Sequence, residues 1–476
     1  MADGVAVHYG TAQGRWVIVA AVLGSGVVFL DGTVVNVALP ALSRDLGASV
    51  RGLQWILDSY LVTLSALLLF GGNAGDRYGR RRMFVAGLAG FVAASVLCGL
   101  APSVGVLIGA RALQGVAGAL LVPASLSIIS AVFDEDDRGK AIGAWSGLAA
   151  VSGAVGPLLG GWLIDAGSWR LIFFLNVPVA AAAVAIALRH TPETRDEDAG
   201  APDVTGAVLV STGIALLAYG LIERSVPAAV GGVVALGAFV AAERRRDHPM
   251  LPLSLFASPQ FSGANLATVA VYGSMSAAWF LITLRLQVTL GYSALEAGTS
   301  FLPYTGLMVG LSAGVGGLAQ RIGPRLPMTI GPLLSAAGLF LSSRIGPGDR
   351  YLSAVLPAVA VYGLGMTVTV SPLTAAVLGG VDRRHAGVAS AVNNVAARLA
   401  GLLGIAIIPA VAGIDTGGGL VRSLDTGYPM ALRISAAICA AGGAIAWWFV
   451  RSSASVRAII HPHHLQACHD ACVEAA

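Results

Sequence analysis

Two ionisable side chains stand inside long apolar stretches of the sequence. Asp31 lies in the run Leu30–Asn36, and Arg111 begins the run Arg111–Gly118. A carboxylate at membrane depth costs a few kcal/mol, so it usually faces a cavity and has a function. Loss of water disfavours its charged form, which allows it to take up a proton. We predict that Asp31 and Arg111 take part in proton coupling; a structural hydrogen bond from Asp31 to Asn36 and a snorkelling Arg111 are the alternatives.

Polar residues in other apolar stretches predict a path for a solute. Asp58 lies near one end of the stretch 53–73, where it would attract a cation or relay a proton, and a position at headgroup depth explains it equally well. Gln114 follows Arg111 by one helical turn and shares its face. The predicted substrate path consists of Asp58, Gln114, Asn393, Asn394 and Arg398.

A glycine- and arginine-rich segment, Gly71–Arg82, joins two apolar stretches by a very short turn. Its glycines permit the turn. Asp76 can lie at a helix end or pair with an arginine of the opposite half. We predict a conformational latch there, and a simple positively charged membrane anchor is the alternative. The predicted latch residues are Gly72, Asp76, Arg77, Gly79 and Arg81.

The stretch 140–163 carries the run Gly153–Gly161, with Pro157 inside it. Gly156 and Gly160 form a small-residue face that lets helices approach closely. Pro157 bends a helix and frees a carbonyl group. We therefore predict close packing against the other half of the molecule. The motif residues are Gly153, Gly156, Pro157 and Gly160.

Two other patterns resemble metal sites, and neither predicts one. Asp134–Asp137 is a short acidic run between apolar stretches, and no second acidic cluster accompanies it. The histidines and cysteines between His461 and Cys472 lack the spacing of a rigid metal site. We predict no metal, no cofactor and no catalytic residues, so the chain is not expected to be an enzyme.

Composition indicates an integral membrane protein. Of 476 residues, 56% are hydrophobic and 11% are charged, and the mean hydropathy is +0.78. Soluble proteins carry about 25% charged residues. The arginines are scattered among short loops, which argues against binding to nucleic acid.

A spanning helix needs about 20 apolar residues, and the sequence predicts about fourteen such helices. They lie near 16–38, 53–73, 83–101, 105–132, 140–163, 170–188, 205–223, 227–243, 264–288, 299–319, 326–345, 352–376, 387–411 and 430–450. Most arginines fall on the side that carries both ends of the chain. The positive-inside rule therefore predicts cytoplasmic termini.

The spacing of Gly72, Arg77 and Gly79 recurs at Gly316, Arg321 and Gly323, which indicates an internal repeat. Two related six-helix halves around a cleft are a transporter plan. The predicted organisation is an N-terminal half at 1–188, a cytoplasmic linker at 189–204, an inserted helix pair at 205–243, a C-terminal half at 244–451 and a cytoplasmic tail at 452–476.

Taken together, these motifs resemble those of the major facilitator superfamily, in particular its fourteen-helix drug:proton antiporters. The segments that carry the resemblance are Asp31–Pro40, Gly72–Arg81, Arg111–Gly118, Gly153–Gly161, Trp169–Arg170 with Asn176 and Pro178, and Gly291–Pro303.

The resemblance implies an all-α membrane fold with two six-helix halves and two inserted helices. It also implies a proton-driven exporter of hydrophobic drugs or antibiotics, cationic ones among them. A transporter specific for one metabolite is the alternative. The expected partners are a small-molecule substrate, protons and lipid, and the expected form is a monomer in the bacterial plasma membrane.

Overall fold

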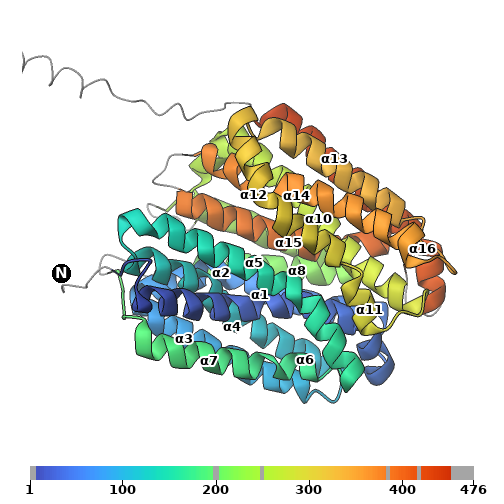
Figure 1. Ribbon diagram of the computed structural model, residues 1–476, viewed down its shortest axis with the longest axis horizontal. Coiled ribbons are helices and arrows are strands. Elements are labelled where there is room, and N and C mark those ends of the chain that lie inside the picture. Colours follow the sequence, from blue (N-terminus) through green and yellow to red (C-terminus); the bar gives the residue numbers. More distant parts are fainter. Residues whose placement is uncertain (1–6, 197–202, 247–250, 382–385, 415–419, 452–476) are drawn as a thin grey trace, which may run out of the picture.

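The computed structural model describes residues 7–196, 203–246, 251–381, 386–414 and 420–451, which are almost entirely helical (Figure 1). The centre of the predicted linker and the tail with His461 and Cys472 lie outside these ranges. The helices are α1 Ala12–Leu46, α2 Val50–Tyr78, α3 Arg80–Gly99, α4 Val104–Val132, α5 Glu135–Ala166, α6 Leu171–Phe174, α7 Asn176–His190, α8 Val204–Ile222, α9 Val226–Glu243, α10 Pro259–Val288, α11 Ala294–Thr299, α12 Leu302–Ile322, α13 Arg325–Ser342, α14 Leu356–Gly379, α15 Ala386–Val411 and α16 Leu420–Phe449.

Each predicted span falls on one of these helices. Ten described helical segments are long and apolar enough to cross a membrane, or up to eleven when the bent α2 is included. The other predicted spans are α5, α12 and α13, which are rich in glycine, serine or charged residues. The predicted span 170–188 is interrupted at Leu175, and the span 352–376 begins with a π-helical turn at Tyr351–Val355. The result agrees approximately with the expected count and confirms the all-helical membrane fold.

The helices form two groups, here called the N-terminal half (α1–α7) and the C-terminal half (α10–α16). In the first, α1 packs on α5 and α7, and α2 and α3 pack on α4. In the second, α10 packs on α15 and α16, and α13 and α14 pack on each other. Figure 1 shows the first group, in blue to green, beside the second, in yellow to red.

Glycines set the close packing of α5 on α1. A Cβ atom at Gly156 would lie 2.2 Å from Thr33 Oγ1, and one at Gly160 would lie 2.3 Å from Val34 Cγ2. Atoms cannot approach so closely, so a larger residue at either position would push the helices apart. These two motif glycines therefore hold α5 against the part of α1 that follows Asp31.

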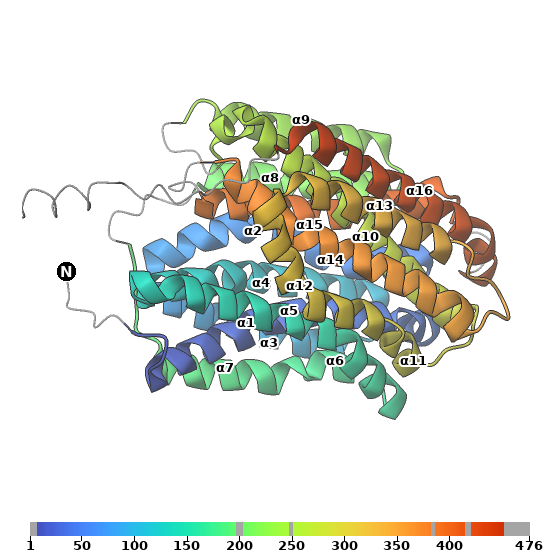
Figure 2. The same ribbon diagram turned by 45° about the horizontal axis from the view of Figure 1, so that its top comes forward.

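The helices α8 and α9 pack on each other, and α8 also lies against α2 and α15. Figure 2 shows α9 on the outside of this pair. Ile214 and Ala218 of α8 pack with Leu399 and Leu402 of α15. Glu223, which caps the end of α8, also makes hydrogen bonds with α2.

Glu223 binds two side chains of α2. Arg51 Nη1 donates a hydrogen bond to Glu223 Oε2 at 3.2 Å, and Trp55 Nε1 donates to Glu223 Oε1 at 2.8 Å. The pair α8–α9 is therefore fastened to the N-terminal half.

The two halves are joined by hydrogen bonds at the end of the molecule where α1 ends and α2 begins, here called the closed end. Gln287 Nε2 on α10 donates to the carbonyl of Val37 on α1 at 3.0 Å. Gln54 Nε2 on α2 donates to the carbonyl of Ile405 on α15 at 2.7 Å. Amide side chains thus bind backbone carbonyls across the boundary.

A second contact at the closed end joins α5 to α11. The Asp165 carboxylate accepts hydrogen bonds from the backbone N–H groups of Ala294 and Leu295, at 3.2 and 2.9 Å. The backbones also meet directly, since a Cβ atom at Gly298 would lie 2.3 Å from the Pro157 carbonyl oxygen. The glycine–proline segment of α5 therefore packs against the C-terminal half in this conformation.

Candidate functional site

A buried ion pair lies in the middle of the N-terminal half. Asp31 on α1 and Arg111 on α4 are 0% and 1% exposed, and Arg111 Nη1 donates a short hydrogen bond to Asp31 Oδ2. The other carboxylate oxygen, Asp31 Oδ1, accepts from Gln114 Nε2 at 3.1 Å and from Asn176 Nδ2 at 3.0 Å. Three N–H donors therefore converge on one carboxylate.

The surroundings of the pair hold each donor in place. Arg111 Nε donates to the carbonyl of Ile56 at 3.2 Å, and the guanidinium carbon lies 4.2 Å from the centre of the Tyr60 ring. Ser95 Oγ accepts from Gln114 Nε2 at 2.8 Å and from Asn176 Nδ2 at 3.2 Å. The cluster is closed by these bonds, so a change in the charge of Asp31 must rearrange several side chains.

Asn176 reaches the cluster from the first turn of α7. Leu175 separates the short α6 from α7, and Asn176 is the first residue of α7. The sequence identifies Asn176 only through the resemblance, and it gives no sign of Ser95. An asparagine in an apolar run is a usable signal, whereas a serine is common in helix packing.

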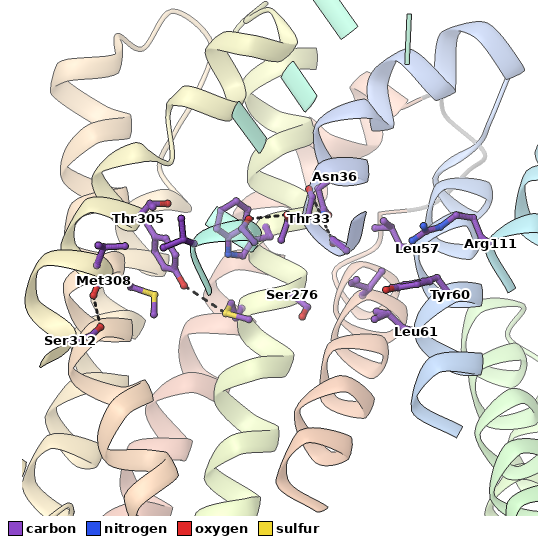
Figure 3. Close-up of a pocket in the computed structure, with 18 residues that line it drawn as sticks. Thr33, Asn36, Leu57, Tyr60, Leu61, Arg111, Ser276, Thr305, Met308 and Ser312 are labelled. Carbon is purple, nitrogen blue, oxygen red and sulfur yellow. Dashed lines mark hydrogen bonds between the residues drawn. The ribbon is translucent and has the colours of Figure 1, made fainter. Parts of the chain in front are cut away.

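A cavity of about 580 Å³ lies between the two halves (Figure 3). Its volume falls in the range of small-molecule sites. Figure 3 shows Thr305 and Met308 on one wall and Leu57 and Tyr60 on the opposite wall. The lining residues are Gly32, Thr33, Asn36, Leu57, Tyr60, Leu61, Arg111, Val151, Gly153, Met275, Ser276, Trp279, Tyr304, Thr305, Met308, Val309, Ser312 and Ile405.

Arg111 connects the cavity with the buried carboxylate. It lines the cavity, whereas Asp31 lies behind it and is fully buried. Val37 and Gln54, which bond across the halves, lie beyond the lining residues Asn36 and Leu57 toward the closed end. The cavity is therefore sealed on that side by contacts between the halves.

The residues predicted for the substrate path lie outside the lining of this cavity. Asp58 is fully buried, and neither carboxylate oxygen has a hydrogen-bond partner among the described residues. Gln114 is buried in the Asp31 cluster. Asn394 is exposed. Sequence reasoning selected polar residues, but the cavity wall is largely aromatic, sulfur-containing or weakly polar.

Asn393 and Arg398 lie on α15 near the boundary of the halves. Asn393 Nδ2 donates to Asn265 Oδ1 at 3.1 Å and to Thr268 Oγ1 at 2.7 Å. The Arg398 guanidinium carbon lies 5.9 Å from the centre of the Phe29 ring, and its Nε is buried without a hydrogen-bond partner in the described chain.

The predicted latch segment binds the beginning of the linker. Asp76 pairs with Arg80 one turn further along, with the carboxylate oxygen Oδ1 at 2.8 Å from Arg80 Nε. Glu193 accepts from the backbone N–H groups of Arg81 and Arg82 at 3.0 and 3.2 Å. The sequence predicts Asp76 either at a helix end or paired with an arginine of the opposite half. In this conformation it lies at a helix end. The latch role stays a prediction.

The C-terminal half contains a second buried arginine, Arg285. It pairs with Asp425 at 2.5 Å, and its Nε donates to the carbonyl of Ile345 at 3.0 Å. The Asp425 side chain is 44% exposed, so this pair reaches the protein surface.

Comparison with known proteins agrees with this architecture. The sequence profile of the Major Facilitator Superfamily matches residues 21–405. The chain is 35% identical to the tetracenomycin C resistance and export protein of Streptomyces glaucescens, over 82% of this chain and 74% of that protein. It is also 35% identical to the cephamycin export protein of Amycolatopsis lactamdurans, over 86% of this chain and 87% of that protein.

Solved transporter structures share the fold. A POT family transporter superposes with a TM-score of 0.71 at 12% identity, over 93% of this chain and 96% of that one. A D-xylose–proton symporter superposes with a TM-score of 0.67 at 15% identity, over 93% and 99%. These likenesses confirm the fold expected from the motifs. The profile match and the curated relatives establish that the chain is a membrane transport protein rather than an enzyme and that it belongs to the Major Facilitator Superfamily.

Proposed function

We propose that this protein exports hydrophobic antibiotic or drug molecules in exchange for protons. Its relatives include proteins named for resistance to, or export of, tetracenomycin C, cephamycin and puromycin. The observation that carries the proposal is the arrangement of Arg111, which lines the cavity while it binds the buried Asp31 carboxylate. A ligand in the cavity and a proton on Asp31 therefore act on one side chain.

The coupling follows from the bonds of the cluster. With Asp31 ionised, Arg111 is held in the cavity wall and the cavity is open to a ligand. A proton on Asp31 removes the negative charge that holds the guanidinium. The released guanidinium then moves toward the space that a ligand would fill. Ligand and proton exclude each other by this route, which is the requirement for exchange.

The arginine distribution orients the protein with both termini in the cytoplasm of a bacterium. The closed end then faces outward, and the cavity receives its ligand from the cytoplasmic side. Protonation from outside and reopening toward the cytoplasm complete the cycle.

The proton gradient supplies enough free energy without a cofactor. One proton contributes about 1.4 kcal/mol per pH unit and about 2.3 kcal/mol per 100 mV of membrane potential. One proton per cycle therefore sustains a concentration ratio of roughly a hundredfold under a modest gradient.

Everted membrane vesicles test the exchange directly. Their lumen is acidified, a panel of hydrophobic drugs is added, and proton release is followed with a pH-sensitive dye. Wild type is expected to release protons, and Asp31→Asn is expected to release none. Asp137→Asn is the control, since Asp137 binds Lys140 on the protein surface, 2.8 Å away.

Equal proton release by wild type and Asp31→Asn would refute the role of Asp31. A folded, inserted wild type that responds to no drug would refute drug–proton exchange, and the same vesicles would then be tested with metabolites.

A further inference from the structure

The cavity has a distinct aromatic wall in the C-terminal half. Trp279 stacks on Phe301 with ring centres 4.1 Å apart, and the edge of Tyr304 meets it at 5.5 Å. Phe301 is buried, whereas Trp279 is half-buried and lines the cavity. One face of the indole is thus supported from behind while the side chain borders the open space. A supported aromatic surface favours a flat, unsaturated ligand that stacks upon it.

Flexible side chains beside this wall adapt it to different ring systems. Met275 and Met308 both line the cavity. Thioethers are polarizable and fill irregular gaps next to aromatic rings. The neighbouring hydroxyl groups of Ser276 and Thr305 can donate or accept hydrogen bonds. The wall therefore suits a planar molecule with carbonyl or hydroxyl substituents.

The charges near the cavity are positive in balance. Arg111 is the only Asp, Glu, Lys or Arg among the described lining residues. Its partner Asp31 balances it from behind. Arg398 adds a positive charge beside Phe29, and Phe29 borders the lining residue Gly153.

Asp58, the other carboxylate of this region, is fully buried and outside the lining. A cationic ligand would therefore lose its hydration next to a net positive charge, with no carboxylate among the described lining residues to receive it.

We propose that the cavity binds planar aromatic molecules that carry no positive charge. The ligand stacks on Trp279, and its oxygen atoms accept hydrogen bonds from the hydroxyl groups of Ser276 and Thr305. This inference rests on the proposed export function, because it takes the cavity as the ligand site, and it replaces the expectation that cationic drugs are substrates.

Two ligands with one ring system isolate the charge. Acridine is uncharged at mildly alkaline pH, and N-methylacridinium is a permanent cation of nearly equal shape. Binding of each to the purified full-length protein in lipid nanodiscs is measured by fluorescence. We expect acridine to bind at least about tenfold more tightly, which corresponds to about 1.4 kcal/mol.

Three variants tie the preference to named residues. Trp279→Ala is expected to weaken acridine binding about tenfold, and Trp279→Phe, which keeps a ring, should restore most of it. Arg398→Gln is expected to tighten binding of the cation and so to narrow the difference between the two ligands.

Equal or tighter binding of N-methylacridinium by wild type would overturn the inference, as would unaltered acridine binding by Trp279→Ala. The assay needs no proton gradient. Acridine preference without drug-dependent proton release would therefore support the ligand class while it refuted exchange.

Discussion

The two halves of the molecule share a packing plan but differ in what they bury. The N-terminal half encloses a carboxylate and an arginine, Asp31 and Arg111, at 0% and 1% exposure. The C-terminal half encloses a neutral cluster, in which Asn393 donates to Asn265 and Thr268. Under the proposed function the two halves would divide the tasks: the N-terminal half would respond to protons, and the C-terminal half supplies most of the aromatic surface of the cavity.

The arginine pairs of the two halves sharpen this contrast. Arg111 and Arg285 are both buried, and both bind a carboxylate. Asp31 is sealed from solvent, whereas the Asp425 side chain is 44% exposed. Breaking a fully buried pair costs about 3–5 kcal/mol, and breaking the Arg285–Asp425 pair should cost less because solvent reaches its carboxylate. The same two residue types therefore serve different purposes at different depths.

The largest effect is expected when the two carboxylates are neutralised separately. Asp31→Asn removes the carboxylate that we propose takes up the proton and should abolish proton exchange, whereas Asp425→Asn should retain most of it because Asp425 lies at the protein surface and outside the cavity lining. Proton release in vesicles measures both. Comparable losses in the two variants would refute the division between the halves.

The next effect concerns the contact that joins the halves. Gly298→Ala places a methyl group 2.3 Å from the Pro157 carbonyl oxygen and should disfavour the closed end by about 1–3 kcal/mol. Hydrogen–deuterium exchange of α11 should rise in this variant. Gly306→Ala is the control, because the space at its Cβ position is open. Gly291→Ala would not serve, because Gly291 has φ 73°, a backbone conformation in which alanine is strained. Unchanged exchange in Gly298→Ala would show that this contact does not hold the closed end.

A smaller effect tests the aromatic wall as a property of the C-terminal half. Trp279→Ala should raise the ligand concentration needed for half-maximal proton release about tenfold, with the maximal rate largely retained. The reason is that Trp279 would contact the ligand in the proposed binding mode, and it lies outside the Asp31 cluster. A fall in maximal rate at unchanged half-maximal concentration would contradict this assignment.

The smallest effect compares the two polar clusters. Asn393→Ala removes two hydrogen bonds and should lower the free energy of unfolding by about 1 kcal/mol. Gln114→Ala should cost more, since it leaves a buried carboxylate with one donor fewer. Thermal unfolding in detergent gives the order of the two variants, and the reverse order would mean that the neutral cluster is the more important one for stability.

Much of the fold could be predicted because membrane helices contrast strongly with their loops. Asp31 and Arg111 stand out for the same reason, as charges in apolar runs, and the structure brings them together. The interruption at Leu175 has a signal in the sequence, because Pro178 has no backbone N–H to donate to the carbonyl of Phe174.

The cavity wall could not be predicted from one sequence. Trp279 and Tyr304 are apolar residues of apolar helices, and only the relative position of the halves decides which aromatic rings face the space between them. Asp76 has several arginines within reach, so its pairing with Arg80 depends on the conformation that the turn adopts.

The attachment of α8 has a mechanical consequence. Glu223 ties this helix to Arg51 and Trp55 of α2, whereas Ile214 and Ala218 meet α15 through aliphatic contacts that have no preferred direction. If the halves rotate relative to each other, the helices α8 and α9 are expected to move together with α2, and the face of α8 that contacts α15 is expected to slide along it. The interface of α8 and α15 should therefore tolerate the exchange of one aliphatic residue for another. A new hydrogen-bonding group at this interface should be tolerated far less well.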